Sequence, residues 1–126
     1  MLHHLSFGVE DLSRAAKFYD AVLMTLGYVR VWSEATAVGY GLAGEGDKFA
    51  IKLERNGRAV TGPGFHTAFS APSREAVVRF YEEALRYGGQ DNGAPELCRD
   101  YGEHYFAAFV IDPDGYRIEA VINRPE

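Results

Sequence analysis

The residues of this chain best suited to chemistry are two histidines, His4 and His66, and one carboxylate, Glu119. Imidazole and carboxylate groups are ligands for several divalent metals, including Zn, Ni, Mn and Fe. Three protein ligands leave coordination positions open for water or substrate, which a metal needs in order to act as a Lewis acid. Taken singly, a strand histidine is more often a hydrogen-bonded residue, and a glutamate is more often solvated or salt-bridged. The metal interpretation therefore depends on a fold that brings the three together.

An internal repeat gives a reason to expect such a fold. A shift of 62 residues, without a gap, places His4 on His66. The same shift aligns Phe7 with Phe69, Phe18-Tyr19 with Phe80-Tyr81, Leu23 with Leu85 and Gly27 with Gly89. The segment ending at Lys52 matches the segment ending at Glu119 at a shift of 67. If a pseudo-twofold axis relates the halves, His4 and His66 occupy matching places, and so do Lys52 and Glu119.

Hydrophobic periodicity predicts the same order of elements in each half, a βαβββ unit of about sixty residues. In the first half, Asp11 is a helix N-cap and Gly27 ends the helix. In the second half, Pro72-Ser73 begins the helix and Gly88-Gly89 stops it. The predicted strands cover residues 2–9, 28–32, 36–42, 48–54, 65–71, 94–99, 104–111 and 116–123, with a loop over 56–64. The fold class is α+β, and residues 1–126 form one domain made of two modules, about 1–57 and 65–124.

The turn Asp112-Pro113-Asp114-Gly115 precedes a last strand whose faces differ in polarity. Tyr116, Ile118, Ala120 and Ile122 share one face, and Glu119 lies on the other. A carboxylate in the middle of such a strand needs a cationic partner. In the first strand, alternation likewise puts His4 on the face opposite the apolar residues and separates it from its neighbour His3.

Composition excludes several classes of function. The chain has 126 residues and a formal net charge of −5, and no run of Lys or Arg offsets that charge. We therefore expect no nucleic-acid partner. No apolar segment reaches the length of a membrane span, and the N-terminus lacks a signal-peptide pattern. The single Cys98 excludes an internal disulfide and suits a reducing compartment, so we expect a cytoplasmic protein.

Three parts of the chain together resemble the vicinal oxygen chelate superfamily. They are the stretch from His4 to Leu12, the pair Phe18-Tyr19, and the turn 112–115 followed by Ile118-Glu119. The superfamily contains glyoxalases, fosfomycin-resistance thiol transferases, methylmalonyl-CoA epimerase, extradiol dioxygenases and the bleomycin-resistance proteins. The resemblance covers essentially the whole chain. It implies two tandem βαβββ modules whose curved mixed sheets enclose a cleft, with the helices outside, usually in a homodimer. It also implies that the metal ligands are His4, His66 and Glu119.

Lys52 departs from the glyoxalase pattern, in which a carboxylate at that position serves as fourth ligand and catalytic base. A protonated lysine can do neither. It could instead hold an anionic group of the substrate, act as a base if burial lowers its pKa, or form an ion pair with Glu119. The last option would leave a binding cleft without a metal.

Three functions follow from these residues. We expect a glyoxalase-like metalloenzyme of the lyase, isomerase or thiol transferase type, with Glu119 and Lys52 in catalytic roles. The alternative is a metal-free small-molecule binding protein like the bleomycin-resistance proteins. A dioxygenase ranks lowest, because it needs iron and a further acid or base, for which His104 is the one unassigned histidine with any claim. In each case the expected substrate-binding residues are Lys52, Arg99, Tyr101, Tyr105 and Trp32, although packing is the commoner role for each aromatic residue taken singly.

Overall fold

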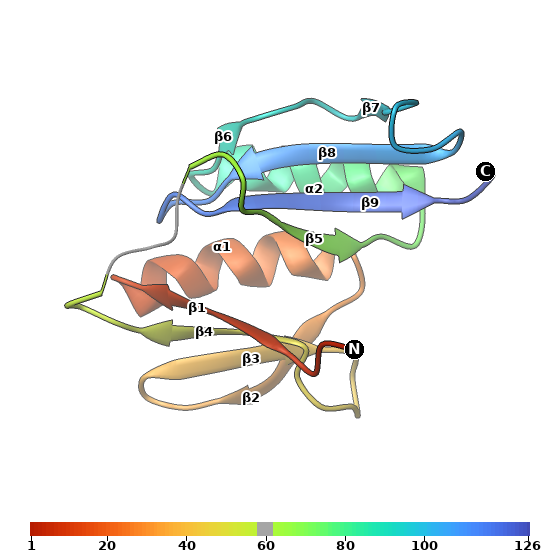
Figure 1. Ribbon diagram of the computed structural model, residues 1–126. Coiled ribbons are helices and arrows are strands. Elements are labelled where there is room, and N and C mark those ends of the chain that lie inside the picture. Colours follow the sequence, from red (N-terminus) through yellow and green to blue (C-terminus); the bar gives the residue numbers. More distant parts are fainter. Residues whose placement is uncertain (58–61) are drawn as a thin grey trace.

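The computed structural model describes residues 1–57 and 62–126, and the loop predicted over 56–64 lies partly outside the described residues. The first half contains β1 (Leu5–Val9), α1 (Leu12–Met24), β2 (Val29–Ser33), β3 (Ala37–Gly41) and β4 (Phe49–Leu53). The second half contains β5 (Thr67–Ser70), α2 (Arg74–Arg86), β6 (Gln90–Asp91), β7 (Glu96–Leu97), β8 (Tyr105–Ile111) and β9 (Arg117–Asn123). The α+β class is confirmed: two helices accompany two mixed sheets that do not close into a barrel (Figure 1). Neither helix in the described part of the chain is both long and apolar enough to span a bilayer.

The two helices confirm the shift of 62, because both ends of α1 and α2 are offset by that number. The predicted N-caps also correspond. The side chain of Asp11 accepts a hydrogen bond from the Arg14 amide at 3.0 Å, and that of Ser73 accepts one from the Ala76 amide at 3.1 Å. Such caps satisfy amides that the helix itself leaves without partners. Local sequence chemistry therefore sets the same start for each helix.

The two sheets share a topology but show that one predicted correspondence is wrong. Their strand orders are β1-β4-β3-β2 and β5-β9-β8-β6, with β1 parallel to β4 and β5 parallel to β9. Ser6 pairs with Ala50, whereas Ala68 pairs with Glu119. Since Ser6 and Ala68 correspond under the shift of 62, the residue that matches Glu119 is Ala50. Lys52 lies two residues further along β4, beside Gly8.

The error has a physical reason. Side chains in a strand alternate with a period of two, so a slip of two residues keeps every side chain on its face and leaves the hydrophobic pattern unchanged. Three predicted strands are also clearly shorter in the structure, including the one predicted over 65–71, which covers Thr67–Ser70. The first begins at Leu5 rather than Leu2, and the one predicted over 94–99 is reduced to Glu96–Leu97. The short strand β6 was not predicted, because two residues carry no detectable alternation.

The helix-bearing sides of the two sheets meet in one hydrophobic core. The rings of Phe7 in β1 and Tyr116, just before β9, are stacked with their centroids 3.9 Å apart, and Phe49 in β4 contacts Phe69 in β5 edge-on at 5.2 Å. In Figure 1, α1 lies between the two sheets. The opposite face of each sheet, which carries Ser6 in one module and Glu119 in the other, points away from this shared core.

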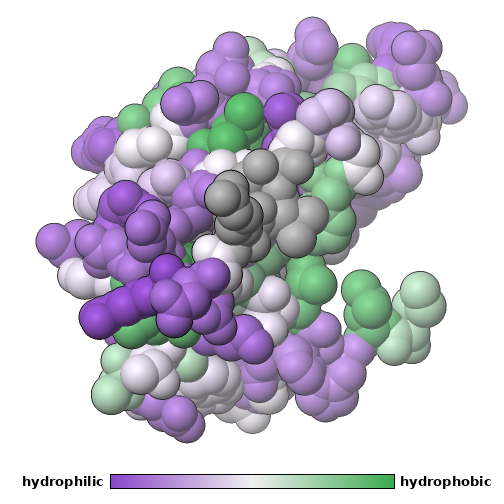
Figure 2. All heavy atoms as spheres, turned by 60° about the vertical axis from the view of Figure 1, so that its left-hand side comes forward, coloured by the Kyte–Doolittle hydropathy of each residue, from purple (hydrophilic) through white to green (hydrophobic). Residues whose placement is uncertain are grey.

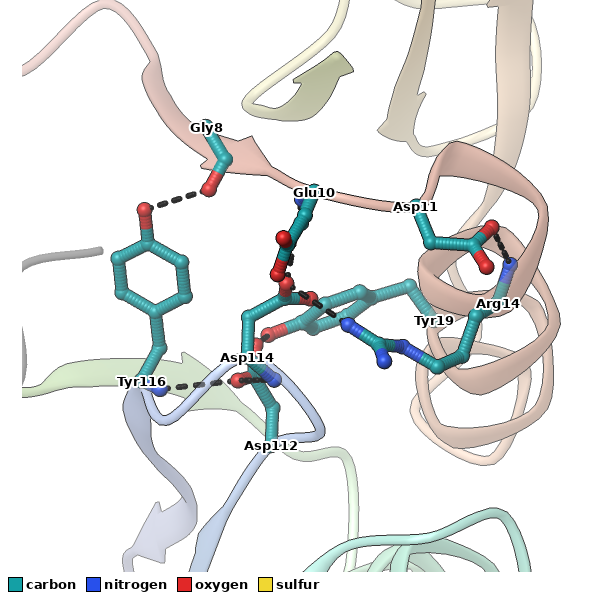
Figure 3. Close-up of polar contacts among 8 residues, drawn as sticks. All are labelled: Gly8, Glu10, Asp11, Arg14, Tyr19, Asp112, Asp114 and Tyr116. Carbon is teal, nitrogen blue, oxygen red and sulfur yellow. Dashed lines mark hydrogen bonds and ion pairs between the residues drawn. The ribbon is translucent and has the colours of Figure 1, made fainter. Parts of the chain in front are cut away.

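A polar cluster fastens the turn before β9 to the first module (Figure 3). The buried Asp112 accepts a hydrogen bond from the Tyr19 hydroxyl at 2.5 Å and from the amides of Asp114 and Tyr116 at 2.9 Å each. Asp114 forms an ion pair with Arg14 at 3.0 Å. Burial raises the pKa of Asp112 to about 6, and burial also raises the pKa of Tyr19. The predicted turn is therefore also a contact between modules.

Candidate functional site

A buried carboxylate, Glu119, is the centre of the candidate site. It lies in the middle of β9 and is only 1% exposed. Ala68 on the neighbouring strand β5 pairs with Glu119, and His66 lies two residues before Ala68, just ahead of the strand. The Nε2 atom of His66 is 2.9 Å from Glu119 Oε1. The imidazole side chain is 54% exposed. The pair therefore runs from the protein interior to the surface, as a site that exchanges ligands with solvent requires.

Tyr105 contacts the other oxygen of the same carboxylate. Its hydroxyl donates a hydrogen bond to Glu119 Oε2 from the adjacent strand β8. Burial, and then the nearby Glu119 carboxylate, raise the pKa of Tyr105, so the phenol remains a donor at neutral pH. The Tyr101 ring meets the Tyr105 ring edge-on at 5.4 Å. Each oxygen of Glu119 thus has its own partner.

His66 and Glu119 are close to each other, but their separation is that of a hydrogen bond. Two ligands of a tetrahedral metal ion with bonds of about 2.1 Å lie about 3.4 Å apart. The observed separation of Nε2 and Oε1 is 2.9 Å. A third ligand is not supplied alongside them, since no group of three His, Cys, Asp or Glu residues in the described ranges could hold a metal ion.

His4 lies elsewhere in the chain. It is exposed, and its Nδ1 atom is 2.8 Å from Nδ1 of His3. It borders a cavity of about 260 Å³ between the start of β1 and β5, with Leu5, Phe49 and Phe69 among its apolar lining residues. Within one chain, the structure therefore brings together His66 and Glu119 but not His4.

Lys52 is also separate from Glu119, because the two belong to different sheets. Lys52 is exposed, and no ion pair involving it is found among residues 1–57 and 62–126. Trp32 lies on the same face of the first sheet, covering Gly39: a β-carbon added at Gly39 would come within 2.3 Å of the indole. Trp32 and Lys52 thus share a face, apart from the His66–Glu119 pair.

The remaining predicted binding residues gather beside the pair. Arg99 and Tyr101 line a groove of about 510 Å³ together with Cys98 and Phe109. Phe109 pairs directly across from Glu119, and its ring centroid is 6.3 Å from that of His66. His104, by contrast, is partly exposed and lies 4.0 Å from the exposed carboxylate of Glu103.

Sequence reasoning missed two neighbours of the pair, Phe109 and Cys98. Burial, followed by Glu96 and then Glu119, raises the pKa of the Cys98 thiol. Both residues are identified by the pairing of β8 with β7 and β9. Alternation assigns a face but gives no cross-strand register, so nothing in the sequence pointed to them.

Comparison with known proteins assigns the chain to a family. The family model described as "Glyoxalase/Bleomycin resistance protein/Dioxygenase superfamily" matches residues 1–120. The chain belongs to this superfamily. A glyoxalase/bleomycin resistance protein from Albidiferax ferrireducens T118 is 33% identical, with a TM-score of 0.80 and 97% of each chain covered.

More distant superfamily structures share the fold alone. The fosfomycin resistance protein FosX from Mesorhizobium loti is 18% identical, with a TM-score of 0.69, and the match covers 98% of this chain and 92% of that one. A bleomycin resistance determinant encoded on the transposon Tn5 is 19% identical, with a TM-score of 0.63 and 95% of each chain covered. No curated protein matches the sequence.

Proposed function

We propose that this superfamily member is a glyoxalase-like metalloenzyme of the lyase, isomerase or thiol transferase type, acting on a small molecule with vicinal oxygens. The observation that carries the proposal is the contact between His66 and the buried Glu119 carboxylate at 2.9 Å. A buried carboxylate is costly unless a cation or several donors compensate it. The structure gives it a neutral donor, Tyr105, and the imidazole of His66, and both are compatible with a carboxylate that holds a metal ion.

We propose that His4 of the partner subunit supplies the third ligand in a homodimer. Strands β1 and β5 are edge strands of their sheets, and β1 begins one residue after His4 as β5 begins one residue after His66. An open edge is a template for pairing with another chain. On the face seen in Figure 2, hydrophobic side chains surface beside a notch between the upper and lower parts of the molecule. Pairing β1 with β5 across a twofold axis would bring His4 of the partner subunit toward His66 and generate two equivalent sites.

The chain's own residues have separate roles in this proposal. His66 and Glu119 hold the divalent ion, which supplies Lewis-acid chemistry by polarising bound oxygens. Tyr105 keeps the carboxylate hydrogen-bonded, while Arg99 and Tyr101 in the adjacent groove contact the substrate. Trp32 and Lys52, on the corresponding face of the first sheet, form the opposite wall once the partner subunit is in place. Lys52 there holds an anionic group of the substrate rather than acting as a ligand.

Metal binding by purified variants tests the proposal. Calorimetry with Zn²⁺ should show tight binding by the wild type and its loss in His66→Ala and Glu119→Gln. His104→Ala is the matched control, because it removes an imidazole that pairs with Glu103 and has no role in the proposed metal site, and it should bind like the wild type. Equal losses in all three variants, or no binding by the wild type, would contradict the proposal.

The second candidate is a metal-free small-molecule binding protein. It is favoured by one observation, which is that no three metal-binding side chains lie together in the described ranges. Such a protein would bind its ligand in the groove lined by Arg99 and Tyr101 and would show no metal-dependent gain in melting temperature.

A further inference from the structure

We infer that Arg117 binds the oxyanion group of a small organic ligand on the open face of the second sheet. The inference rests on the proposed function in one respect, which is that a small molecule binds beside Glu119, and it involves no metal ion. It starts from a cation that the fold buries in part and leaves without a partner. Within residues 1–57 and 62–126, the side chain of Arg117 makes no hydrogen bond, ion pair or ring contact, and its Nε atom is buried without an acceptor.

Arg117 differs in this respect from the other arginines in the described part of the chain. Most of them have a carboxylate, a carbonyl or an aromatic ring as partner, namely Arg14, Arg30, Arg74, Arg79, Arg86 and Arg124. Arg55 and Arg99 also lack one, but both are exposed to solvent. Carboxylates are not scarce, since the chain has 18 acidic residues and 13 basic ones. A buried donor without an acceptor costs free energy, and an anionic ligand would relieve that cost at Arg117.

The register of the sheet places Arg117 next to the candidate site. Arg117 precedes Glu119 by two residues on β9, so the two lie on the same face, which points away from the core. By extension of the parallel register of β5 and β9, His66 lies beside Arg117. Both oxygens of Glu119 already have partners, His66 and the Tyr105 hydroxyl, and no ion pair joins Glu119 to Arg117 within the described ranges. Arg117 is thus a free cation beside an engaged carboxylate.

The neighbours of Arg117 on β8 indicate the rest of the ligand. Ile111 pairs directly with Arg117, and Phe109 pairs with Glu119. Both side chains are partly exposed on this face. A guanidinium offers a planar fork of donors that fits a carboxylate or a phosphate, whereas an aliphatic and an aromatic side chain favour an apolar body. The matching ligand is a carboxylate or phosphate attached to a compact apolar group, and benzoate is a suitable probe.

Calorimetric titration of metal-depleted protein with benzoate tests the inference. The wild type should bind benzoate saturably, and Arg117→Gln should bind it about tenfold or more weakly, because hydrogen bonds to a charged group are lost. Arg117→Lys keeps the charge but not the fork, so its affinity should lie between the two. Phenyl phosphate, titrated in parallel, distinguishes the two oxyanions, since the group that the site prefers should give the tighter binding.

Arg55→Gln is the matched control, because it removes another arginine without a partner, at an exposed position of the first module. Its affinity for benzoate should stay within about twofold of the wild type at 0.15 M salt, where distant charges are screened. Equal affinity of Arg117→Gln and the wild type, or no binding of either probe by the wild type, would overturn the inference.

A second measurement needs no variant and so remains decisive if Arg117→Gln does not fold. Nuclear Overhauser contacts should join the ring protons of bound benzoate to the side chains of Phe109 and Ile111 in the wild type. Contacts confined to other residues would overturn the inference. A wild type that binds benzoate but not Zn²⁺ would contradict the proposed metal chemistry and leave the anion site standing, whereas one that binds Zn²⁺ but neither probe would overturn this inference alone.

Discussion

At the scale of the residue, the described ranges contain two buried carboxylates with different surroundings. Asp112 and Glu119 are 3% and 1% exposed. Asp112 is enclosed by two backbone amides and the buried Tyr19, which leaves no route for a ligand. Glu119 instead contacts His66, whose side chain is half exposed. The first carboxylate therefore serves the fold, and the second reaches solvent through His66, which is why we propose a chemical role for it.

Asp112 should make folding stability depend on pH. Burial raises its pKa to about 6 in the folded protein, above its ordinary value of 3.8. The folded state therefore binds this proton more tightly than the unfolded state does. The resulting stabilisation is complete below about pH 4 and is lost as the pH rises through about 6. The loss is on the order of 2 to 3 kcal/mol, since one unit of pKa corresponds to about 1.4 kcal/mol.

Urea unfolding of Asp112→Asn and the wild type from pH 4 to 7 measures this effect. The unfolding free energy of the wild type, relative to that of Asp112→Asn, should fall as the pH rises. Glu34→Gln, at an exposed position, corrects for the removal of one negative charge. A difference that stays constant across this range would contradict the assigned role of Asp112.

The register of β4 makes a second prediction at the residue scale. Ala50, rather than Lys52, occupies the place that matches Glu119. In the proposed dimer, Ala50→Glu should add an oxygen ligand and tighten Co²⁺ binding. Lys52→Glu is the matched control. It adds the same carboxylate two residues away, and its effect should be limited to screened electrostatics, about threefold or less at 0.15 M salt. A larger gain in Co²⁺ affinity for Lys52→Glu than for Ala50→Glu would instead favour the correspondence of Lys52 with Glu119 that the sequence suggested.

At the scale of the element, the first sheet depends on the close packing of Trp32 on Gly39. Gly39→Ala would place a methyl group within 2.3 Å of the indole, so the ring must move. Overpacking of this kind costs about 1–3 kcal/mol. Trp32 is the sole tryptophan of the chain, so its fluorescence reports the displacement directly. We expect a red-shifted emission and a lower melting temperature.

Gly46→Ala is the control for that experiment, because an added β-carbon there meets nothing within 4 Å. It should leave both the emission and the melting temperature unchanged. Unaltered emission in Gly39→Ala would show that the indole does not rest on Gly39 in solution.

The sequence predicted those features of the helices and strands that depend on neighbouring residues, and not those that depend on distant ones. The caps Asp11 and Ser73 act within one turn of their helices, so both helix starts were predicted correctly. The register of β4 depends on hydrogen bonds to β1, a segment about forty residues away in the chain. A shift of two residues keeps every side chain on the same face, so the hydrophobic alternation of the sequence does not reveal it. The same limit applies to the site. The repeat predicted that His4, His66 and Glu119 converge, and within one chain only His66 and Glu119 do. The contact of Tyr105 with Glu119 could not be predicted without the pairing of β8 and β9.

At the scale of the whole molecule, the duplication sets where a complete site can form. The modules meet through their helix-bearing sides, as the stacking of Phe7 on Tyr116 demonstrates. The faces that carry the candidate ligands are therefore turned away from each other within a chain. Two modules can present those faces to one another when they come from different subunits, which is why we propose a homodimer with shared sites.

Mixing two defective variants tests whether the sites are shared. His4→Ala and His66→Ala homodimers should each lack every complete site. In a mixed dimer, His4 of the second variant meets His66 and Glu119 of the first, so one of the two sites is restored. Random re-association yields mixed dimers in about half of the population, so about a quarter of the wild-type Co²⁺ capacity should return after unfolding and refolding the mixture. A site confined to one chain would recover nothing, since every chain carries one defect. Refolding each variant alone supplies the baseline, and light scattering that shows monomers at micromolar concentration would contradict the dimer itself.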